Sequence, residues 1–444
     1  MQKIEIKYLG PIKEINMEIK DFNLLIGEQA TGKSTVAKAI YFFRMIKSTL
    51  TDYLCQIYEE GLYNGKTVNK GFNKVLKREL KSDFISLFGY SWDLDKRLYL
   101  RYEYADGIWI DVKLNGNEKA RRYISVGYSK CLTREISILE QEALVLHEQK
   151  MDMNISLAYV SKERRRNCDN FKNSVNRIFD DYKETYYIPA GRSMITLLVN
   201  NRSLIESENL DLITREFMKI IDSIHGAFSD GIRNVHKRYP DGERKFDVGK
   251  ISETLIDDLK GDYQYHAGKE YIITQNPKMQ GEKIPINFAS SGQQEVLWLL
   301  NQLYILMLKK ENAFVIIEEP EAHLYPGLQN KVVEFISYFA NMNNSSIMLT
   351  THSPYILTSV NVLYCAGKVI RDFPHLTKRV YEILGSKCEI APENVTAFKI
   401  NRDTSVQDLI NNEFKEINTE MIDEISDHVN EKYTGLFYLL SELE

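Results

Sequence analysis

A glycine-rich loop near the start of the chain stands between an apolar run and a helical pattern. The apolar run is 22–26, and apolar residues at helical spacing follow over 35–49. The loop itself, 27–34, reads GEQATGKS and fits the pattern GxxxxGK(S/T). In such a loop, backbone N–H groups and the positive end of the following helix surround phosphate groups. The loop therefore predicts an α/β fold that binds the phosphates of a nucleotide.

The side chains of this loop have separate expected roles. Lys33 would reach the β- and γ-phosphates of ATP, and the hydroxyl of Ser34 would bind Mg²⁺. The residues expected to contact the nucleotide are Gly27, Glu28, Gln29, Ala30, Thr31, Gly32, Lys33, Ser34 and Thr35. The alternative is a glycine loop that only turns a strand into a helix.

Composition narrows the class of protein. The chain has 444 residues, of which 43% are hydrophobic and 27% charged, with a formal net charge of −5. This length indicates two or three domains, or one domain with a large insertion. This net negative charge excludes a protein whose overall positive charge attracts nucleic acid nonspecifically. The five cysteines are scattered and form no CxxC pair, which is typical of a protein in the reducing cytoplasm. No apolar segment reaches the ~18 residues that a membrane helix needs. We therefore expect a cytoplasmic protein without a membrane partner.

Periodicity predicts the order of strands and helices along the chain. Strand patterns cover 1–26, 98–112, 186–188, 270–273, 284–288, 313–317 and 346–351. Helical patterns cover 35–49, 131–181, 191–260, 293–310, 328–341 and the acidic tail 395–444. The alternation of helix and strand over 290–352 is typical of a parallel sheet.

The apolar run 313–317 ends in two adjacent carboxylates, Glu318 and Glu319. This is the shape of a Walker B segment, in which Glu318 would hold the Mg²⁺ shell and Glu319 would position or deprotonate the attacking water. The first acid here is Glu rather than the more usual Asp. Two solvated acids at a strand end would explain this segment alone, but the glycine loop favours the catalytic interpretation.

Two further segments indicate a function only when they are considered together with the glycine loop and the paired carboxylates. The segment 289–295 precedes an amphipathic helix, and its Ser290 lies 29 residues before Glu319. Ser291 and Gln294 have the spacing of a capping box, which needs no ligand, yet a helix N-terminus is also a phosphate site. His352 follows the last apolar strand, where a lone histidine is usually structural or solvated.

The order of these segments resembles that of the ABC-type P-loop ATPases of the RecF, SMC and OLD branch. The residues that match the LSGGQ-type signature of this class are Ser290, Gly292 and Gln293, with Ser291 in place of the first glycine. His352 resembles the switch histidine, which contacts the γ-phosphate, and is therefore a catalytic candidate with Lys33 and Glu319. The stretch 318–324 resembles the EEPEAHLHP-like sequence of this branch, in which we interpret His323 as structural or as a dimer contact.

A segment at 187–193 looks like the IPAxR sequence of anti-phage ATPases in the same branch. It offers Arg192 where other members have the glutamine of the Q-loop, so the resemblance makes Arg192 a candidate nucleotide-binding residue. The alternative is a role at the start of a helix.

The resemblance implies a fold and a division of the chain. The expected fold is an α/β P-loop ATPase head of ABC type with a mixed parallel core sheet, an antiparallel β subdomain and a helical insertion. The expected parts are a P-loop lobe (1–130), a mainly helical insertion (131–260), a lobe with signature, Walker B and switch histidine (261–360), and a C-terminal α/β to helical tail (361–444). Together they would form one split head.

The resemblance also implies an assembly. In this class the signature of one subunit completes the nucleotide pocket of another, so that Ser290 would act in trans. ATP with Mg²⁺ would then join two copies in a homodimer or a higher oligomer, and hydrolysis would reset this switch.

Spacing and missing motifs separate this chain from its best-known relatives. Lys33 and Glu319 are 286 residues apart, and the surplus lies in 131–260, where no heptad pattern of an SMC coiled coil is sustained. No TOPRIM-like acidic cluster follows His352. The sequence resembles the ATPase subunits of the PARIS and Septu anti-phage systems, which implies a separate nuclease or toxin as the effector.

Three functions remain open at this point. The first is a defence ATPase that controls a separate effector, the second a RecF-like repair ATPase that binds DNA directly, and the third an assembly scaffold with slow turnover. The second would use a basic run whose cations are Lys162, Arg164, Arg165 and Arg166. A solvated helix face is the more common explanation of such a run.

Overall fold

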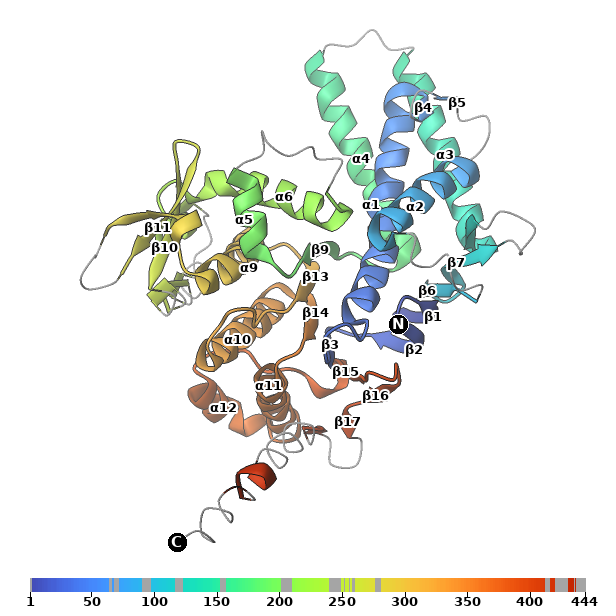
Figure 1. Cartoon of the computed structure of the whole chain (residues 1–444). Helices are drawn as coiled ribbons and strands as arrows, with labels where there is room; N and C mark the ends of the chain where they lie inside the picture. The colour runs from blue at the N-terminus through green and yellow to red at the C-terminus, as the bar shows by residue number, and fades with distance from the viewer. Residues whose placement is uncertain are drawn as a thin grey trace, which may run out of the picture.

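The computed structural model in Figure 1 is an α/β structure built around two sheets. It describes residues 2–63, 66–67, 72–89, 97–115, 123–151, 157–200, 210–238, 249–275 without 251, 255, 258 and 259, 281–411, 416–419, and 430–436 without 435.

A six-stranded mixed sheet forms the centre, in the order β16-β15-β3-β14-β13-β9. Its strands are β3 (Phe22–Gly27), β9 (Glu184–Ile188), β13 (Ala313–Glu318), β14 (Ser346–Thr351), β15 (Val395–Ile400) and β16 (Val406–Asp408). All neighbouring pairs are parallel except β15 with β16. The carboxyl ends of β3, β14, β13 and β9 therefore meet at one edge, and ligands of open α/β sheets bind at that edge.

The two faces of this sheet are covered by different helices. These are α1 (Lys33–Glu60) on one face, and α9 (Ser291–Lys309), α10 (Pro326–Asn343) and α11 (Pro354–Asp372) on the other. Along β13, Ala313, Val315 and Ile317 pack with the cluster of α9 to α11, whereas Phe314 and Ile316 pack with that of α1. Figure 1 shows α10 and α11 on the left of β14 and α1 on its right. A strand with both faces buried needs a continuous apolar run, as β3 and β13 have.

A second sheet of five antiparallel strands packs on the far side of α1. Its order is β2-β1-β6-β7-β8, from β1 (Gln2–Leu9), β2 (Ile12–Ile19), β6 (Tyr99–Ala105), β7 (Ile108–Asn115) and β8 (Tyr123–Tyr128). Alternate residues such as Ile4 and Ile6 are buried against α1, while Lys3 and Glu5 face outward. This alternation is typical of a sheet with one solvated face.

The remaining helices contact α1, α9, α11 or one of the small sheets. They are α2 (Phe72–Phe88), α3 (Lys130–Met151), α4 (Leu157–Phe179), α5 (Arg192–Asn200), α6 (Leu212–Ile224), α7 (Ile232–Val235) and α12 (Thr377–Leu384). Short 3-10 turns are η4 (His225–Phe228), η5 (His236–Arg238), η6 (Ile286–Phe288), η7 (Pro374–Leu376) and η8 (Pro392–Asn394). The helices α1, α3 and α4 contact one another and project together at the top of Figure 1.

Small sheets complete the fold. One has the order β10-β11-β12, from β10 (Gly261–His266), β11 (Lys269–Thr274) and β12 (Lys283–Pro285). Two others are the pairs β4 (Leu62–Tyr63) with β5 (Lys66–Thr67) and β17 (Ile410–Asn411) with β18 (Glu416–Ile417). In the part of the chain that the structure describes, no helix is both long enough and apolar enough to cross a bilayer.

The predicted fold class is confirmed: a mixed core sheet, an antiparallel sheet and a group of helices. The prediction of a helical tail from residue 395 is wrong for its first part, because 395–400 forms the core strand β15. This short apolar run is buried against β3, and the pairing partner, not local periodicity, decides its conformation. The strand expected at 284–288 is shorter, since η6 begins at Ile286. Residues 420–429 and 437–444 of the tail lie outside the described residues.

Candidate functional site

The glycine loop leaves β3 and enters α1 at the carboxyl edge of the central sheet. Gly32 has φ 106°, and a side chain there would put its Cβ 2.5 Å from Ile12 Cδ1. A Cβ on Gly27 would lie 2.3 Å from the Ile400 carbonyl oxygen. Both positions therefore require glycine. Because Gly32 caps α1 without a side-chain hydrogen bond, the first N–H groups of the helix remain available for an anion.

The Lys33 side chain lies folded over this loop. Its Nζ donates to the carbonyl oxygens of Gly27 (2.9 Å) and Glu28 (2.6 Å), and the residue is only 5% exposed. Burial lowers the pKa of Lys33 to about 8, against the charges of Glu319 and other nearby carboxylates, which raise it. The cation has no carboxylate in direct contact among its hydrogen bonds, which suits it to a phosphate.

His352, at the end of β14, joins the glycine loop to the Walker B segment. Its Nδ1 lies 3.1 Å from Lys33 Nζ, and its Nε2 lies 2.7 Å from Glu319 Oε1. Because a carboxylate only accepts, Nε2 carries a proton, while Nδ1 also lies 3.0 Å from the carbonyl oxygen of Gly27. Glu319 itself has φ 44°, a left-handed conformation that is uncommon outside glycine. The structure thus brings together Lys33, His352 and Glu319, each following a different parallel strand.

Two oxygen groups near the loop fit a magnesium ion. Glu318 is 6% exposed, and its Oε1 has no hydrogen-bond partner, whereas Oε2 accepts from Ala190 N at 3.3 Å. The alternation along β13 places Glu318 on the face of Phe314 and Ile316, which is covered by α1. Ser34 is exposed in the first turn of α1. A buried carboxylate oxygen without a partner and a free hydroxyl are the hard oxygen ligands that Mg²⁺ prefers.

Glu321 is a site residue that sequence reasoning missed. Its Oε1 accepts from Thr351 Oγ1 (2.6 Å), His352 N (2.8 Å) and Ser353 N (3.3 Å), so it holds the segment that carries His352. The signal was present in the stretch 318–324, where this acid is the third carboxylate after the strand.

The signature segment begins α9 as expected, but its capping register differs from the prediction. Ser290, not Ser291, is the N-cap, and it forms the capping box with Gln293: Ser290 N donates to Gln293 Oε1 at 3.1 Å. Gln294 donates instead to the Ile286 carbonyl at 2.7 Å. Gly292 packs on the loop after β13, since a Cβ there would lie 2.9 Å from the His323 carbonyl oxygen. The described hydrogen bonds of Ser290 are with Gln293 and, through its carbonyl oxygen, with the N–H of Gln294, and none joins it to the glycine loop of its own chain.

Arg192 is buried beside the Walker B segment and is not part of the glycine loop. It is the first residue of α5 and has no exposed surface. Its guanidinium donates to the carbonyl oxygens of Glu318 (2.8 Å) and Glu319 (3.0 Å). These contacts are with the backbone of the Walker B segment.

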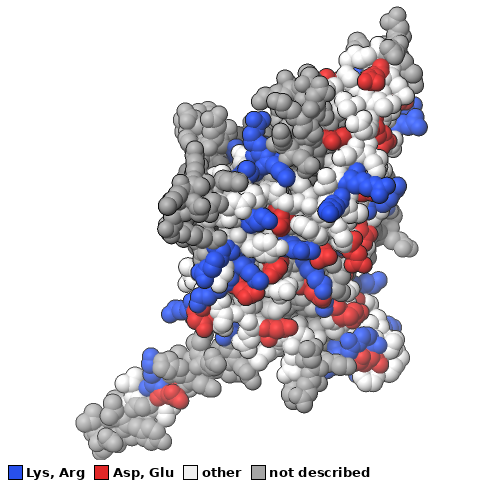
Figure 2. All heavy atoms as spheres, turned by 90° about the vertical axis from the view of Figure 1, so that its right-hand side faces the viewer, with Lys and Arg blue, Asp and Glu red and all other residues white. Residues whose placement is uncertain are grey.

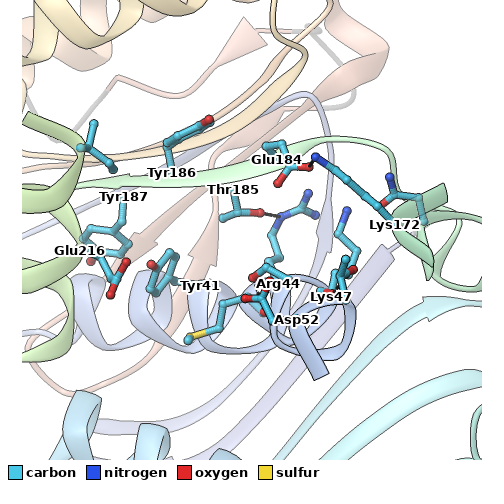
Figure 3. A pocket seen from close by; sticks show the side chains of 15 residues that line it. Tyr41, Arg44, Lys47, Asp52, Lys172, Glu184, Thr185, Tyr186, Tyr187 and Glu216 are labelled. Carbon is cyan, nitrogen blue, oxygen red and sulfur yellow. Dashed lines mark hydrogen bonds and ion pairs between the residues drawn. The ribbon is translucent and has the colours of Figure 1, made fainter. Parts of the chain in front are cut away.

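A buried ion-pair cluster fixes the helix that begins at the loop. Figure 3 shows Arg44 and Lys47 extending from α1 beside a cavity of about 340 Å³ between α1, α4, β9 and α6. Arg44 Nη2 and Lys47 Nζ lie 2.8 Å and 3.1 Å from Asp181 Oδ2, and Arg44 Nε donates to Thr185 Oγ1. Burial alone would raise the pKa of Asp181, but the two cations hold it below its ordinary value. The cluster therefore anchors α1 to β9.

The basic run 162–166 forms an exposed face of α4. Arg164 is ion-paired with Glu59 of α1, and Arg166 Nη1 lies 3.6 Å from Glu163 Oε1. Figure 2 shows the side of the molecule that is on the right in Figure 1, where acidic and basic side chains are intermingled. Intermingled charges give a weaker field for a phosphate backbone than a continuous basic stripe.

Known proteins show where this chain is similar to others. The family model described as an AAA ATPase domain matches residues 59–357, about two thirds of the chain, beginning after the glycine loop. A stretch of 83 residues is 32% identical to Protein ea59 of Escherichia phage lambda. This stretch covers 19% of the chain and 15% of that relative, so the chain spans far less than two thirds of the relative's length.

The solved structures to which this chain is similar include two SMC heads and RecF. The SMC head from Thermotoga maritima is 9% identical with a TM-score of 0.33, over 80% of this chain and 90% of that one. The SMC head from Pyrococcus furiosus, bound to the C-terminal domain of ScpA, is 11% identical with a TM-score of 0.37, over 97% and 100%. The recombination mediator protein RecF, in its structure as RecF-ATPrS, is 10% identical with a TM-score of 0.32, over 92% of this chain and 97% of that one.

Proposed function

The chain belongs to the AAA ATPase domain family, and we propose that it binds ATP with Mg²⁺ and hydrolyses it as an ABC-type switch. The observation that carries this proposal is the hydrogen-bonded chain from Lys33 through His352 to Glu319. It sets a cation, an imidazole and a carboxylate side by side at the edge where the glycine loop enters α1. Phosphoryl transfer needs these groups, because it depends on charge stabilisation and on an oriented water.

Each residue has a role in this proposal. The loop N–H groups and Lys33 hold the phosphates, whose charged oxygens attract the ammonium more strongly than the neutral carbonyls that it contacts here. Glu319 takes the proton of the attacking water, and His352 fixes the Glu319 carboxylate and faces the γ-phosphate. Ser34 and Glu318 hold Mg²⁺. When bound, Mg²⁺ neutralises phosphate charge.

We further propose that two copies pair head to tail, with Ser290 of each copy facing the nucleotide of the other. The exposed start of α9, where Ser290 lies at the surface, supports this arrangement. Two large aromatic side chains beside it, Phe288 and Tyr325, are 76% and 82% exposed. Exposed aromatic groups around a polar site are typical of an interface.

Mixing two inactive variants tests this assembly. Lys33→Ala disables the phosphate loop of its own copy, and Ser290→Arg disables the signature that its copy offers to the other. We expect each variant alone to be inactive and an equimolar mixture to regain about a quarter of wild-type turnover. Half of randomly formed dimers are mixed, and each mixed dimer has one intact composite site. Steady-state phosphate release measures the result.

The control mixture combines Lys33→Ala with Glu319→Gln. Both changes affect the phosphate-loop side of the site, so no mixed dimer has an intact composite site and no turnover should return. If the Ser290→Arg mixture also stays inactive while both proteins bind nucleotide and fold, Ser290 does not act in trans.

As the output of the switch, we propose control of a separate nuclease or toxin in an anti-phage system, in the manner of the ATPase subunits that the motifs resemble. The alternative is a RecF-like ATPase that binds DNA directly. The ion pair of Arg164 with Glu59 and the intermingled charges in Figure 2 weigh against the second function.

DNA stimulation separates the two functions. We expect double-stranded DNA to leave ATP turnover unchanged, and the triple variant Arg164→Glu, Arg165→Glu, Arg166→Glu to behave like the wild type. We also expect the product of a neighbouring effector gene, co-expressed with the tagged chain, to co-purify with it. Turnover that DNA raises several-fold, and that the triple variant loses, would establish the RecF-like alternative instead.

A further inference from the structure

Arg192 joins three segments of the chain in one buried network. Its guanidinium contacts the end of β13 through the carbonyl oxygens of Glu318 and Glu319, and its Nε donates to the carbonyl of Glu295 in α9 at 2.5 Å. A further bond from Nη1 reaches the Pro189 carbonyl at 2.9 Å, just before α5. Only the planar fork of arginine, with five donors, reaches so many acceptors at once.

Glu295 of α9 accepts hydrogen bonds from the start of α5. It is 1% exposed, and its two carboxylate oxygens accept from Arg192 N (3.0 Å), Ser193 N (3.1 Å) and Ser193 Oγ (2.7 Å). Glu295 lies in the second turn of α9, whose N-cap is Ser290. The start of α5 is therefore fastened to the helix that begins with the signature.

The other end of the network is the strained backbone of Glu319. This residue has φ 44°, and its carbonyl accepts from Arg192 Nη2 at 3.0 Å and from Ala322 N at 3.1 Å. Its N–H donates to the Thr350 carbonyl at 2.8 Å. A non-glycine residue keeps such a conformation only where its surroundings impose it. The direction of the Glu319 carboxylate therefore depends on these backbone contacts.

We propose that Arg192 is a positioning residue that couples the signature helix, through Glu295, to the carboxylate of Glu319. This inference rests on the proposed function. When α9 engages the nucleotide of a second copy, its displacement reaches the carbonyl of Glu319 through two buried contacts, and turnover begins only in the assembled dimer. A physical link of this kind between two sites is what a coupling claim requires.

Two conservative variants test the link. Glu295→Gln keeps the shape and one accepting oxygen but removes the charge, and Arg192→Lys keeps the charge but removes the fork. We expect each variant to bind ATP with a KM within about three-fold of wild type and to lose between about 10-fold and 100-fold in kcat, as a small displacement of a catalytic group does. The double variant should lose no more than the worse single variant, because both changes break one path.

Thr196→Val is the matched control. Thr196 is equally buried and joins the same two helices, since it donates to the Arg192 carbonyl (2.9 Å) and accepts from Trp298 Nε1 (3.1 Å), yet it contacts no Walker B residue in these hydrogen bonds. We expect this variant to keep the wild-type kcat per folded molecule.

The outcomes are distinct. If Glu295→Gln and Arg192→Lys keep the wild-type kcat, or lose turnover only in proportion to their folded fraction, Arg192 is a structural residue. This inference is then wrong, while the proposed ATPase function stands. If one variant does not fold, the other decides. A wild-type chain that binds ATP without turning it over would overturn the proposed function, and this inference with it.

Discussion

Replacing Lys33 with alanine is expected to abolish ATP binding. The ammonium is the one side-chain cation held inside the glycine loop among the described residues, and burial already lowers its pKa to about 8. Two or more charge-assisted hydrogen bonds to phosphate are lost with it, each worth about 1.5–3 kcal/mol. The affinity should therefore fall at least about 100-fold. Titration with a fluorescent ATP analogue at pH 7, in the presence of Mg²⁺, measures the change.

Lys38→Ala provides the matched control for this loss. Lys38 lies in the same helix, one and a half turns later, and is partly exposed. We expect the affinity of the Lys38→Ala variant for ATP to stay within about two-fold of the wild-type affinity. Because the buried Lys33 ammonium is itself unfavourable for folding, Lys33→Ala should melt cooperatively near the wild-type temperature. Binding of ATP by a folded Lys33→Ala protein at wild-type affinity would contradict the assignment of the phosphate site.

Replacing Glu319 with glutamine is expected to trap an ATP-bound dimer. Glutamine has the size of glutamate and still offers an oxygen to His352 Nε2, which lies 2.7 Å from the carboxylate, but it cannot accept the proton of water. Turnover should fall by about 10²–10⁴-fold while binding persists. Size-exclusion chromatography with light scattering, with and without ATP and Mg²⁺, should show a dimer or a higher oligomer only with the nucleotide.

The double variant Glu319→Gln, Ser290→Arg isolates the cause of the trapping. It keeps the phosphate loop and lacks the signature hydroxyl, so it should bind ATP and stay monomeric. A Glu319→Gln protein that remains monomeric with bound ATP would rule out the role of Ser290 in trans. Unchanged turnover in Glu319→Gln, despite intact binding, would leave ATP as a structural ligand of a scaffold.

The parts of the site that could be predicted from sequence are those whose signal is local. The loop 27–34 follows its strand and precedes its helix without interruption, so that the sequence alone indicates its geometry. The same holds for Glu318 and Glu319 at the end of an apolar run. The roles of these residues, and the boundaries of the proposed domains, stay predictions that the experiments above address.

Other features depend on distant partners and carry no local signal. The run 395–400 is a strand because β3 pairs with it across more than 370 positions of sequence. Arg192 resembles a ligand-binding residue in its motif, and only the packing of α9 against α5 reveals that its donors are engaged by backbone carbonyls. The predicted capping box, Ser291 with Gln294, is wrong because Ser290 with Gln293 has the same spacing, and the extended backbone of Ser290 makes it the N-cap.

The position of β3 within the central sheet also constrains how this protein is made. Phe22 pairs with Ile347 on one side and with Val395 on the other. When the ribosome has just added Asn344, the glycine loop has already been synthesised. The two strands that flank β3, which are β14 and β15, have not. Contacts between such distant segments form late, since the intervening chain must first be ordered. Truncated products that stop before Val395 thus lack one of the two strands that flank the strand carrying the glycine loop.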